Sequence, residues 1–289
     1  MKLFEDIGTK TKYYFWYLFP FIVYNYYRFK WSYYKKIIII PHGGLGDIAV
    51  LVPALIRLAT QFDEINVFCN SEYFEVIKIL FKLPTNINSI HFPSQNRKEY
   101  LLDTELLKSI GEKGHIIKLG WYGKDPIINF PNCFFLKLGI NPKYANEKYD
   151  IKLPEFINKE VSEFLKQTDK EYIYVNLTTS EELVSFKNEY KTNLPYVSYD
   201  DSALALGVKK FYNVNNLNPD SIHISIINNV VLCLKAAKVI ISDAGLFNVV
   251  IKFNNCPDLT VVTRNHNHSH NNLLYKIKFN GTIQSCSFN

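Results

Sequence analysis

The chain has 289 residues, of which 47% are hydrophobic and 21% are charged, and its formal net charge is +6. This composition excludes a globally disordered chain, and the length suffices for two α/β domains. The positive charge favours anionic partners such as phosphates or a membrane surface, whereas the sequence has no Lys/Arg block of the kind that grips nucleic acid. Five scattered cysteines without a CxxC pair predict free thiols in a reducing cytoplasm.

The first segment, residues 1–34, contains the uncharged aromatic run YYFWYLFPFIVYNYY at 13–27. This run is shorter than the roughly 20 apolar residues of a membrane-spanning helix, and Pro20 interrupts it. Its Tyr and Trp side chains and its flanking cations are typical of a segment that lies in the membrane interface. The alternative is a helix whose aromatic rings pack on the protein's own surface. We expect a cytoplasmic protein that, under the first interpretation, contacts the membrane peripherally.

Residues 35–57 combine a strand, a glycine-rich turn and a helix. The continuous β-branched run Ile37–Ile40 predicts a strand buried on both faces of a parallel sheet. In the following HGGLGD sequence, His42–Asp47, the glycines allow a tight turn or a close approach of backbone to ligand. An amphipathic helix begins directly after this turn, so its free N–H groups would point toward a bound ligand.

Apolar β-type runs then alternate with helical patterns, which implies a parallel sheet with right-handed crossovers. Four prolines between 123 and 154 mark a connection with one short helix at 134–138, so we expect a domain boundary near residue 150. Ser71 is the expected N-cap of its helix. The predicted elements of this half are strands at 65–70, 87–92 and 115–120 and helices at 71–81 and 99–110.

The same alternation restarts after the boundary. It predicts strands at 171–177, 195–199, 209–214, 238–242 and 259–263 and helices at 221–237 and 246–253. The fold class is therefore α/β, with two Rossmann-like domains at 35–150 and 151–289 whose parallel sheets face an interdomain cleft. Ligands of such sheets bind at the carboxyl ends of the strands.

Two small-residue turns are candidates for chemistry. His42–Asp47 lacks the GxGxxG spacing of a dinucleotide site and the Lys-Ser/Thr of a P-loop, which argues against dehydrogenases and NTPases. A structural alternative for this turn is a plain strand-to-helix connection capped by Asp47. In the second half, Ser242–Gly245 also joins a strand to a helix, and helix N-termini suit anions such as phosphate.

These two regions resemble glycosyltransferase family 9, the ADP-heptose:lipopolysaccharide heptosyltransferases. The resemblance lies in IIIIPHGGLGDIAVLVPALIRLATQF at 37–62 and in LCLKAAKVIISDAGLFNVVIKFN at 232–254, and it covers about residues 35–265. It implies a GT-B architecture with two facing Rossmann-like domains. It also implies metal-independent, inverting transfer of a sugar from a nucleotide-sugar to a glycan or glycolipid acceptor, with no cofactor beyond the donor itself.

The resemblance also implies roles for individual residues. Asp47 would be the general base that deprotonates the acceptor hydroxyl. The loop residues that would let acceptor or donor approach are His42, Gly43, Gly44 and Gly46. The residues that would contact the nucleotide-sugar are Ser180, Lys187, Ser242, Asp243, Ala244 and Gly245.

The segment after the last predicted strand, TRNHNHSHNN, carries Arg264 and three alternating histidines at 266, 268 and 270. Imidazoles are good metal ligands, but supporting carboxylates or thiolates are missing from this stretch. Contact of Arg264 and the histidines with phosphate or acceptor is the second interpretation, and a solvated loop is the third.

Two departures from the family pattern keep other functions open. Ala244 stands where the family has Ser, and Asn248 stands where it often has His. One rival is a catalytically degenerate module that binds glycans or a partner protein. Another is a different nucleotide-sugar enzyme on the same fold, such as a synthase-like transferase or an epimerase.

Overall fold

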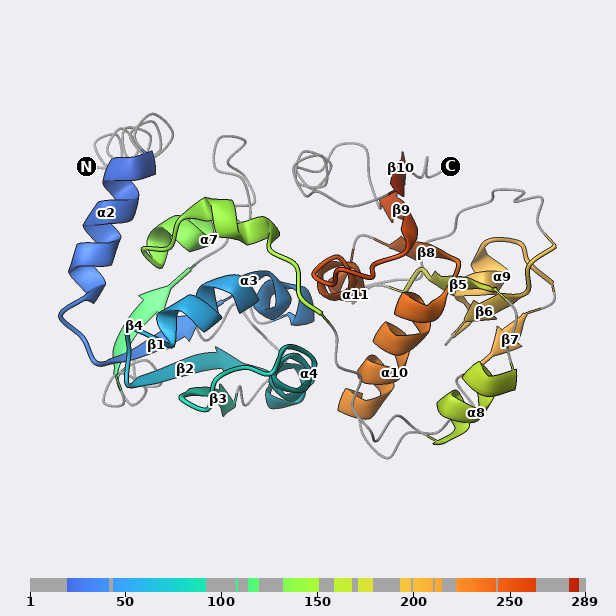
Figure 1. Ribbon diagram of the computed structural model, residues 1–289, viewed down its shortest axis with the longest axis horizontal. Helices are drawn as coiled ribbons and strands as arrows, with labels where there is room; N and C mark the ends of the chain where they lie inside the picture. The colour runs from blue at the N-terminus through green and yellow to red at the C-terminus, as the bar shows by residue number, and fades with distance from the viewer. Residues whose placement is uncertain are drawn as a thin grey trace. The chain divides into compact units, whose positions relative to one another are not determined.

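The computed structural model describes the chain in two compact units (Figure 1). Unit 1 comprises Met1–Phe74 and Leu83–Glu147, and unit 2 comprises Glu75–Lys82 and Lys148–Asn289. The residues that the structure describes are 20–41, 44–91, 108, 114–119, 132–150, 159–167, 171–178, 193–198, 200–209, 211–214, 222–242, 244–263 and 281–285.

Unit 1 contains a four-stranded parallel sheet in the order β3-β2-β1-β4. The chain thus adds β2 and β3 on one side of β1 and β4 on the other. Its elements are α2 (Pro20–Trp31), β1 (Lys36–Ile40), α3 (Leu45–Leu58), β2 (Glu64–Cys69), α4 (Ser71–Phe81), β3 (Ile87–His91), β4 (His115–Lys118), α7 (Asn132–Lys137) and the 3₁₀ helix η1 (Pro142–Asn146). The division between the units falls within helix α4: its residues up to Phe74 belong to unit 1, and those from Glu75 belong to unit 2.

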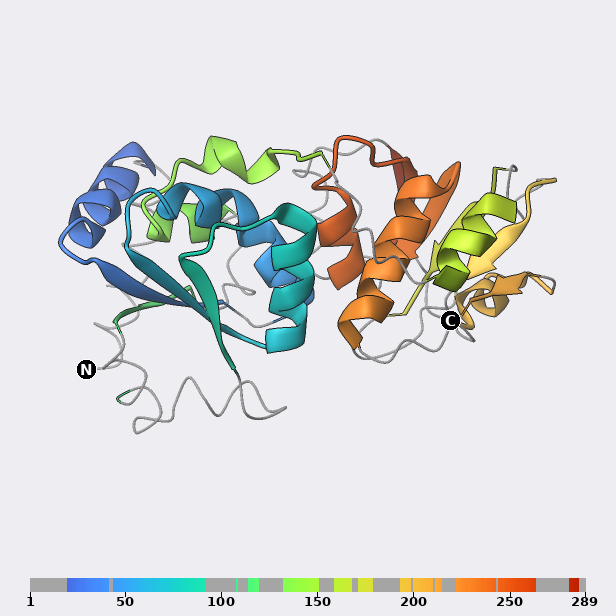
Figure 2. The same cartoon turned by 60° about the horizontal axis from the view of Figure 1, so that its bottom comes forward.

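The core of unit 1 forms because β1 is apolar on both faces. Ile37–Ile40 are almost fully buried. Helix α3 lies across one face of this sheet in both ribbon views (Figure 2) and buries ten residues, from Gly46 to Leu58. On the other face, Ile38 and Ile40 cluster with Phe68. A strand buried on both faces matches the expectation for a central parallel strand.

A polar contact fastens the end of unit 1 to α3. The Arg57 guanidinium donates to both carboxylate oxygens of Glu147, with Nη1 2.7 Å from Oε2, and it lies 3.6 Å above the Tyr144 ring centroid. A bidentate, partly buried pair of this kind is stronger and more directional than an exposed ion pair. It holds the C-terminal turn of α3 against η1.

Unit 2 contains a six-stranded parallel sheet in the order β7-β6-β5-β8-β9-β10. Counted along the chain, this is the order 3-2-1-4-5-6 of the doubly wound nucleotide-binding fold. Its elements are α8 (Lys159–Gln167), β5 (Ile173–Asn176), β6 (Tyr196–Ser198), α9 (Ser202–Ala205), β7 (Tyr212–Asn213), α10 (Ile222–Lys235), β8 (Lys238–Ser242), α11 (Gly245–Val250), β9 (Asp258–Thr263) and β10 (Gly281–Ser285).

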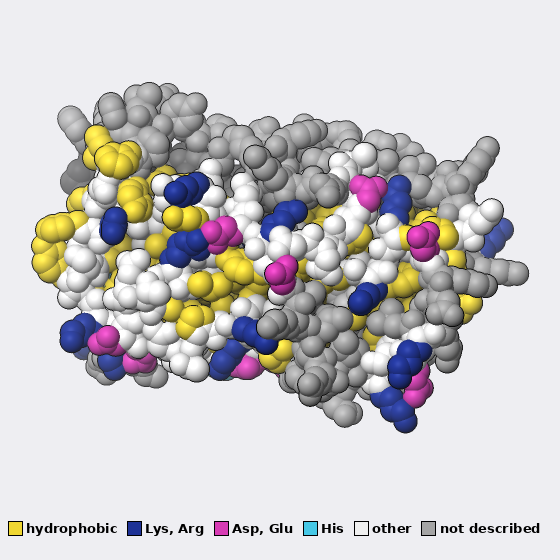
Figure 3. All heavy atoms as spheres, viewed as in Figure 1, with side chains coloured by type: hydrophobic (Ala, Val, Ile, Leu, Met, Phe, Trp, Pro, Cys, Tyr) yellow, Lys and Arg dark blue, Asp and Glu magenta, His cyan; other side chains and the backbone are white. Residues whose placement is uncertain are grey.

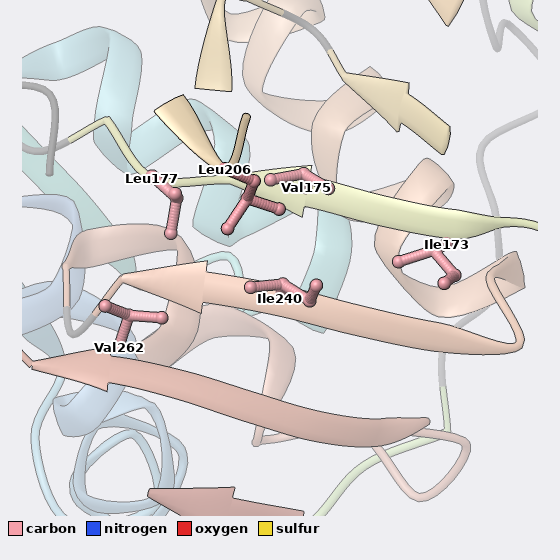
Figure 4. Close-up of a cluster of buried hydrophobic side chains, with 6 residues drawn as sticks. All are labelled: Ile173, Val175, Leu177, Leu206, Ile240 and Val262. Carbon is pink, nitrogen blue, oxygen red and sulfur yellow. The ribbon is translucent and has the colours of Figure 1, made fainter. Parts of the chain in front are cut away.

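Alternate residues of the central strands build the core of unit 2. Figure 4 shows one cluster on the sheet, with Ile240 from β8 and Val262 from β9 facing residues of β5 and the turn after α9. Its members are Ile173, Val175, Leu177, Leu206, Ile240 and Val262. Because β5 and β8 are neighbours, this cluster fixes the pair of strands whose carboxyl ends carry the candidate site.

The predicted strands and helices within the described residues are present. Most shift by one to three residues at an end, but the strand predicted at 209–214 is reduced to Tyr212–Asn213. The expectation that Ser71 caps α4 is wrong: the Asn70 Oδ1 accepts from the N–H groups of Glu72 and Tyr73, so Asn70 is the N-cap. The predicted helix at 99–110 lies outside the described residues except for Lys108. Among the described helices, none is long and apolar enough to cross a bilayer.

Candidate active site

The first candidate centre is the turn between β1 and α3. Gly44 is the N-cap residue of α3, with extended backbone (φ −80°, ψ 159°), and its N–H donates to the Asp47 Oδ2 at 3.0 Å. Glycine has no side chain to return this bond, so the carboxylate alone caps the helix. Bonds from N–H groups to a carboxylate are stronger than neutral ones and orient the acceptor. The helix cap at Asp47, which the sequence predicts under the structural alternative, is therefore present.

Capping does not remove Asp47 from the surface of unit 1. The residue remains partly exposed, whereas the helix positions after it, Ile48–Leu55, are buried. The turn also lies where the strand order of the sheet reverses, between β1 and β4. In open parallel sheets this reversal opens a crevice at the carboxyl ends of the two strands, where ligands bind. Asp47 is thus a fixed carboxylate at the edge where this fold holds ligands.

A cation lies at the same edge of the sheet. The Lys137 Nζ donates to the carbonyl oxygens of Lys118 and Leu119, at 3.3 and 2.9 Å, at the carboxyl end of β4. Leu119 in turn donates its N–H to Ile40 at the end of β1. Burial lowers the pKa of the Lys137 ammonium to about 8. The sequence reasoning missed Lys137, although it is the one charged residue in the apolar stretch 133–140.

The second candidate centre is the turn after β8 in unit 2. Ser242 is fully buried, and its Oγ donates to the carbonyl oxygen of Thr178 at 3.2 Å. Ala244 is the N-cap of α11, with extended backbone (φ −102°, ψ −167°) and no side-chain hydrogen bond to the first turn. The Asn248 Nδ2 lies 3.4 Å from the Ala244 carbonyl oxygen. The N-cap residue of α11 thus supplies no side-chain acceptor of its own to the first turn.

The Ser242–Thr178 bond spans the strand-order reversal of the second sheet. β5 and β8 are the strands numbered 1 and 4 in the 3-2-1-4-5-6 order, and their carboxyl ends border the crevice in which this fold binds nucleotides. The turn that the sequence singles out for phosphate therefore follows one of the two strands that flank the expected nucleotide position.

A polar network next to this crevice is absent from the sequence predictions. The Asp200 carboxylate accepts from the Thr178 and Ser198 hydroxyls and from the Ser202 N–H, the last at 2.8 Å. The Ser202 Oγ accepts from the Leu177 N–H at 2.8 Å. The network ties the carboxyl ends of β5 and β6 to α9. The available signal was an acidic residue directly after the second strand of a Rossmann-like unit, a position that can bind ribose.

The structure thus describes some of the predicted site residues and leaves others out. Gly44, Gly46 and Asp47 lie together at the start of α3, and Ser242, Ala244 and Gly245 lie together at the start of α11. The predicted site residues outside the described part are His42, Gly43, Ser180, Lys187, Asp243 and Arg264. The three histidines at 266, 268 and 270 are also outside it, and the described residues hold no group of three or more side chains that could ligate a metal.

Two parallel α/β units, the second with a nucleotide-binding strand order, define the class of fold found in GT-B glycosyltransferases. The chain is similar to a glycosyltransferase family 9 protein from Veillonella parvula DSM 2008, with a TM-score of 0.53 and 14% identity over 87% of this chain and 86% of that one. At this identity the similarity establishes the fold. By sequence, no protein-family model and no curated protein matches the chain.

Two further solved structures give lower TM-scores. The iron-containing dodecameric glycosyltransferase TibC from enterotoxigenic E. coli H10407 aligns at 0.48, with 13% identity over 79% of this chain and 58% of that one. The E. coli ADP-heptose lps heptosyltransferase II aligns at 0.47, with 11% identity over 78% of this chain and 84% of that one.

Proposed function

We propose that the protein is an inverting glycosyltransferase that moves a sugar from a nucleotide-sugar to a glycan or glycolipid acceptor. The observation that carries the proposal is the placement of Asp47. A single carboxylate, oriented by the Gly44 N–H, lies at the strand-order reversal of a parallel sheet. An inverting transfer requires one general base at the acceptor hydroxyl, and a carboxylate held in this way suits that role.

In the proposed reaction, Asp47 takes the proton of the acceptor hydroxyl while its oxygen attacks the anomeric carbon of the donor sugar. The bond from that carbon to the diphosphate oxygen breaks, and the nucleoside diphosphate leaves with the electron pair. Attack from the face opposite to the leaving group inverts the anomeric centre. General-base assistance of this kind accounts for about 10²–10⁴-fold in rate.

Unit 2 would hold the donor. The support is the 3-2-1-4-5-6 strand order together with the Ser242–Gly245 turn beside β5. N–H groups at the start of α11 would contact the diphosphate, and Asp200 after β6 is placed to accept from a ribose hydroxyl. From the sequence we add Ser180, Lys187, Asp243 and Arg264 as donor contacts. The charges of Lys187 and Arg264 and the N–H groups of α11 would offset the negative charge of the leaving diphosphate. The proposal therefore includes no metal and no further cofactor.

The second candidate is a degenerate module that binds a glycan or a partner protein without transferring sugar. Two observations favour it. Ala244 supplies no hydroxyl at the donor turn. The Asn248 side chain donates to the Ala244 carbonyl oxygen, at the start of its own helix. Under this alternative the Asp47 carboxylate serves only as the cap of α3.

A screen of nucleotide-sugars distinguishes the two candidates. The full chain is heated with ADP-, GDP-, UDP- and CMP-sugars, and the transition temperature is compared with that of the ligand-free protein. A ligand at 100 times its Kd adds about 2.7 kcal/mol of stability, so we expect a clear upward shift with one nucleotide class. Release of the nucleoside diphosphate from that donor would then show transfer to acceptor or water. The absence of a shift with all four classes contradicts the proposal and supports the binding module.

A further inference from the structure

Helix α2 has apolar and aromatic side chains on opposite sides, yet unit 1 covers only one of its faces. The covered face contains Val23 and Trp31, which are 2% and 5% exposed, with Tyr27 between them. Burial raises the pKa of the Tyr27 hydroxyl. Helix α2 packs on α7 along this face. The alternative that the sequence offers, packing on the protein's own surface, is therefore true for one side of the helix.

Specific contacts hold α2 in place. The Trp31 Nε1 donates to the Lys137 carbonyl oxygen at 2.6 Å. At Gly139 (φ +68°), an added Cβ would come within 2.6 Å of the Arg28 backbone nitrogen, so α2 lies against bare backbone there. Past the helix end, the Tyr34 ring stacks on His115 with centroids 4.0 Å apart. Helix α2 is thus a fixed part of unit 1.

The opposite face of α2 and the turn after it present aromatic side chains to solvent. Phe21, Phe29 and Tyr33 are 74%, 64% and 70% exposed, and Ile22 and Tyr26 are exposed beside them. Of the eight large hydrophobic side chains exposed in the described residues, six lie between Phe21 and Tyr34. Figure 3 shows this hydrophobic surface over α2, with Lys and Arg side chains next to it. A contiguous exposed patch of this kind marks an interaction surface.

The charge of the same segment is of one sign. Residues 20–36 contain Arg28, Lys30, Lys35 and Lys36 and no acidic residue. Lys30 lies 4.7 Å from the Trp31 ring centroid, the Arg28 guanidinium donates to the Tyr24 hydroxyl, and Lys36 pairs with Glu64, so cations lie among and beside the aromatic side chains. Aromatic rings flanked by cations are the combination that partitions into the headgroup region of an anionic bilayer.

We propose that this aromatic surface, defined by Phe21, Ile22, Tyr26, Phe29 and Tyr33, inserts into the headgroup region of an anionic lipid bilayer. A second copy of the chain is a poorer occupant, because face-to-face contact would bring the cations of both copies together without an acidic partner in the segment. Since α2 is fixed to unit 1, the bilayer would hold the unit that carries Asp47. The proposal concerns lipid contact and does not depend on sugar transfer.

The test is sedimentation of the full chain with vesicles, using equimolar phosphatidylglycerol and phosphatidylcholine against phosphatidylcholine alone. The test variant is Ile22→Ser/Tyr26→Ser/Phe29→Ser, which changes exposed side chains only. The matched control is Leu204→Ser/Tyr212→Ser, which removes exposed apolar side chains from unit 2. We expect binding to anionic vesicles that the test variant reduces by about tenfold or more and that added salt weakens. The control variant is expected to bind like the wild type.

Three outcomes would overturn the proposal. One is a wild-type chain that does not sediment with anionic vesicles. Another is a test variant that sediments as well as the wild type, which would place any lipid contact elsewhere. The last is a wild-type dimer in solution that the test variant converts to monomers, which would assign the surface to a second copy. Transition temperatures of the variants check folding, and nucleotide-sugar binding, measured separately, reports on the proposed transferase activity.

Discussion

The two turns that follow central strands of the two sheets differ in how their helices begin. After β1, the Asp47 carboxylate accepts from the Gly44 N–H and caps α3, a helix of 14 residues. After β8, Ala244 is the N-cap of α11, a helix of six residues, and makes no side-chain hydrogen bond to its first turn, while the Ser242 hydroxyl donates to the Thr178 carbonyl oxygen. Among the described residues, the first turn supplies a fixed negative charge and the second supplies backbone N–H groups.

This difference separates two chemical tasks. The Asp47 carboxylate, held at the first turn, can accept a proton, whereas backbone N–H groups at the start of α11 can bind a diphosphate but cannot accept a proton. Both turns lie at strand-order reversals, so the fold alone does not distinguish them. The side chains do, and substitutions in each turn should therefore have different consequences.

The largest effect is expected at the first turn. Asp47→Asn keeps the shape and the capping ability of the side chain but removes the base, so turnover should fall by about 10³-fold. Asp63→Asn is the matched control, because Asp63 is an exposed carboxylate in the same unit at the start of β2. Steady-state release of nucleoside diphosphate measures both. Equal turnover of the two variants would leave Asp47 with its capping role alone.

The next largest effect is expected at the edge of the second sheet. A Cβ at Gly281 would come within 1.9 Å of the Leu259 carbonyl oxygen, so Gly281→Ala should lower the free energy of unfolding by about 3 kcal/mol. At Gly207, φ is also positive (+83°), but nothing lies within 4 Å of an added Cβ. Gly207→Ala should therefore cost only about 1 kcal/mol of backbone strain. Urea denaturation compares them, and equal losses would show that contact at Leu259 contributes nothing.

A smaller loss is expected from the network beside the second turn. Asp200→Ala leaves the Thr178 and Ser198 hydroxyls and the Ser202 N–H without this acceptor, which should lower the free energy of unfolding by about 2 kcal/mol. The neighbouring Asp201 makes no capping bond to α9, so Asp201→Ala should change stability by about 0.5 kcal/mol or less. Denaturant titration measures both variants. Similar values for the two would mean that the network does not hold β5 and β6 together.

The last effect depends on pH and concerns Lys137 in unit 1. Its pKa is lowered from the ordinary 10.5 to about 8 by burial, so between these values the unfolded chain holds a proton that the folded chain releases. Wild-type stability should therefore rise, relative to Lys137→Met, as pH increases from 8 to 10.5, and the difference should be flat below pH 8. Lys118→Met, at the exposed end of β4, is the control for the substitution itself. A flat difference for both would contradict the burial of the ammonium.

Local sequence was sufficient for much of the fold. The β-branched run Ile37–Ile40 and the following glycines locate β1 and the start of α3, because burial on both faces and tight turning are local requirements. The end of α11 was less predictable. Lys252 and Phe253 bond to carbonyls three residues back, and Phe253 bridges to Tyr149, so contacts from distant sequence end the helix at Val250 instead of 253.

Local sequence likewise identified some residues of the candidate site and missed others. Asp47 and the Ser242–Gly245 turn were identified because a strand and small residues adjoin them in sequence. Asp200 and Lys137 were not, since their positions depend on which strands are neighbours: β5 beside β6, and β4 beside β1. Strand order is a long-range property that hydrophobic pattern does not encode. The 281–285 strand was missed because its own sequence, GTIQS, contains a single large apolar residue.

The most direct test of the two separate tasks is titration calorimetry with the nucleoside diphosphate that gives the largest thermal shift, on wild type, Asp47→Asn and Ala244→Asp. An Asp at the N-cap of α11 should accept from N–H groups of the first turn and raise stability by about 0.5–1 kcal/mol. The same charge should repel diphosphate and weaken binding by about tenfold or more. Asp47→Asn should bind within about twofold of wild type, because removing the base leaves the donor contacts intact. The account is contradicted if Asp47→Asn loses binding while Ala244→Asp retains it.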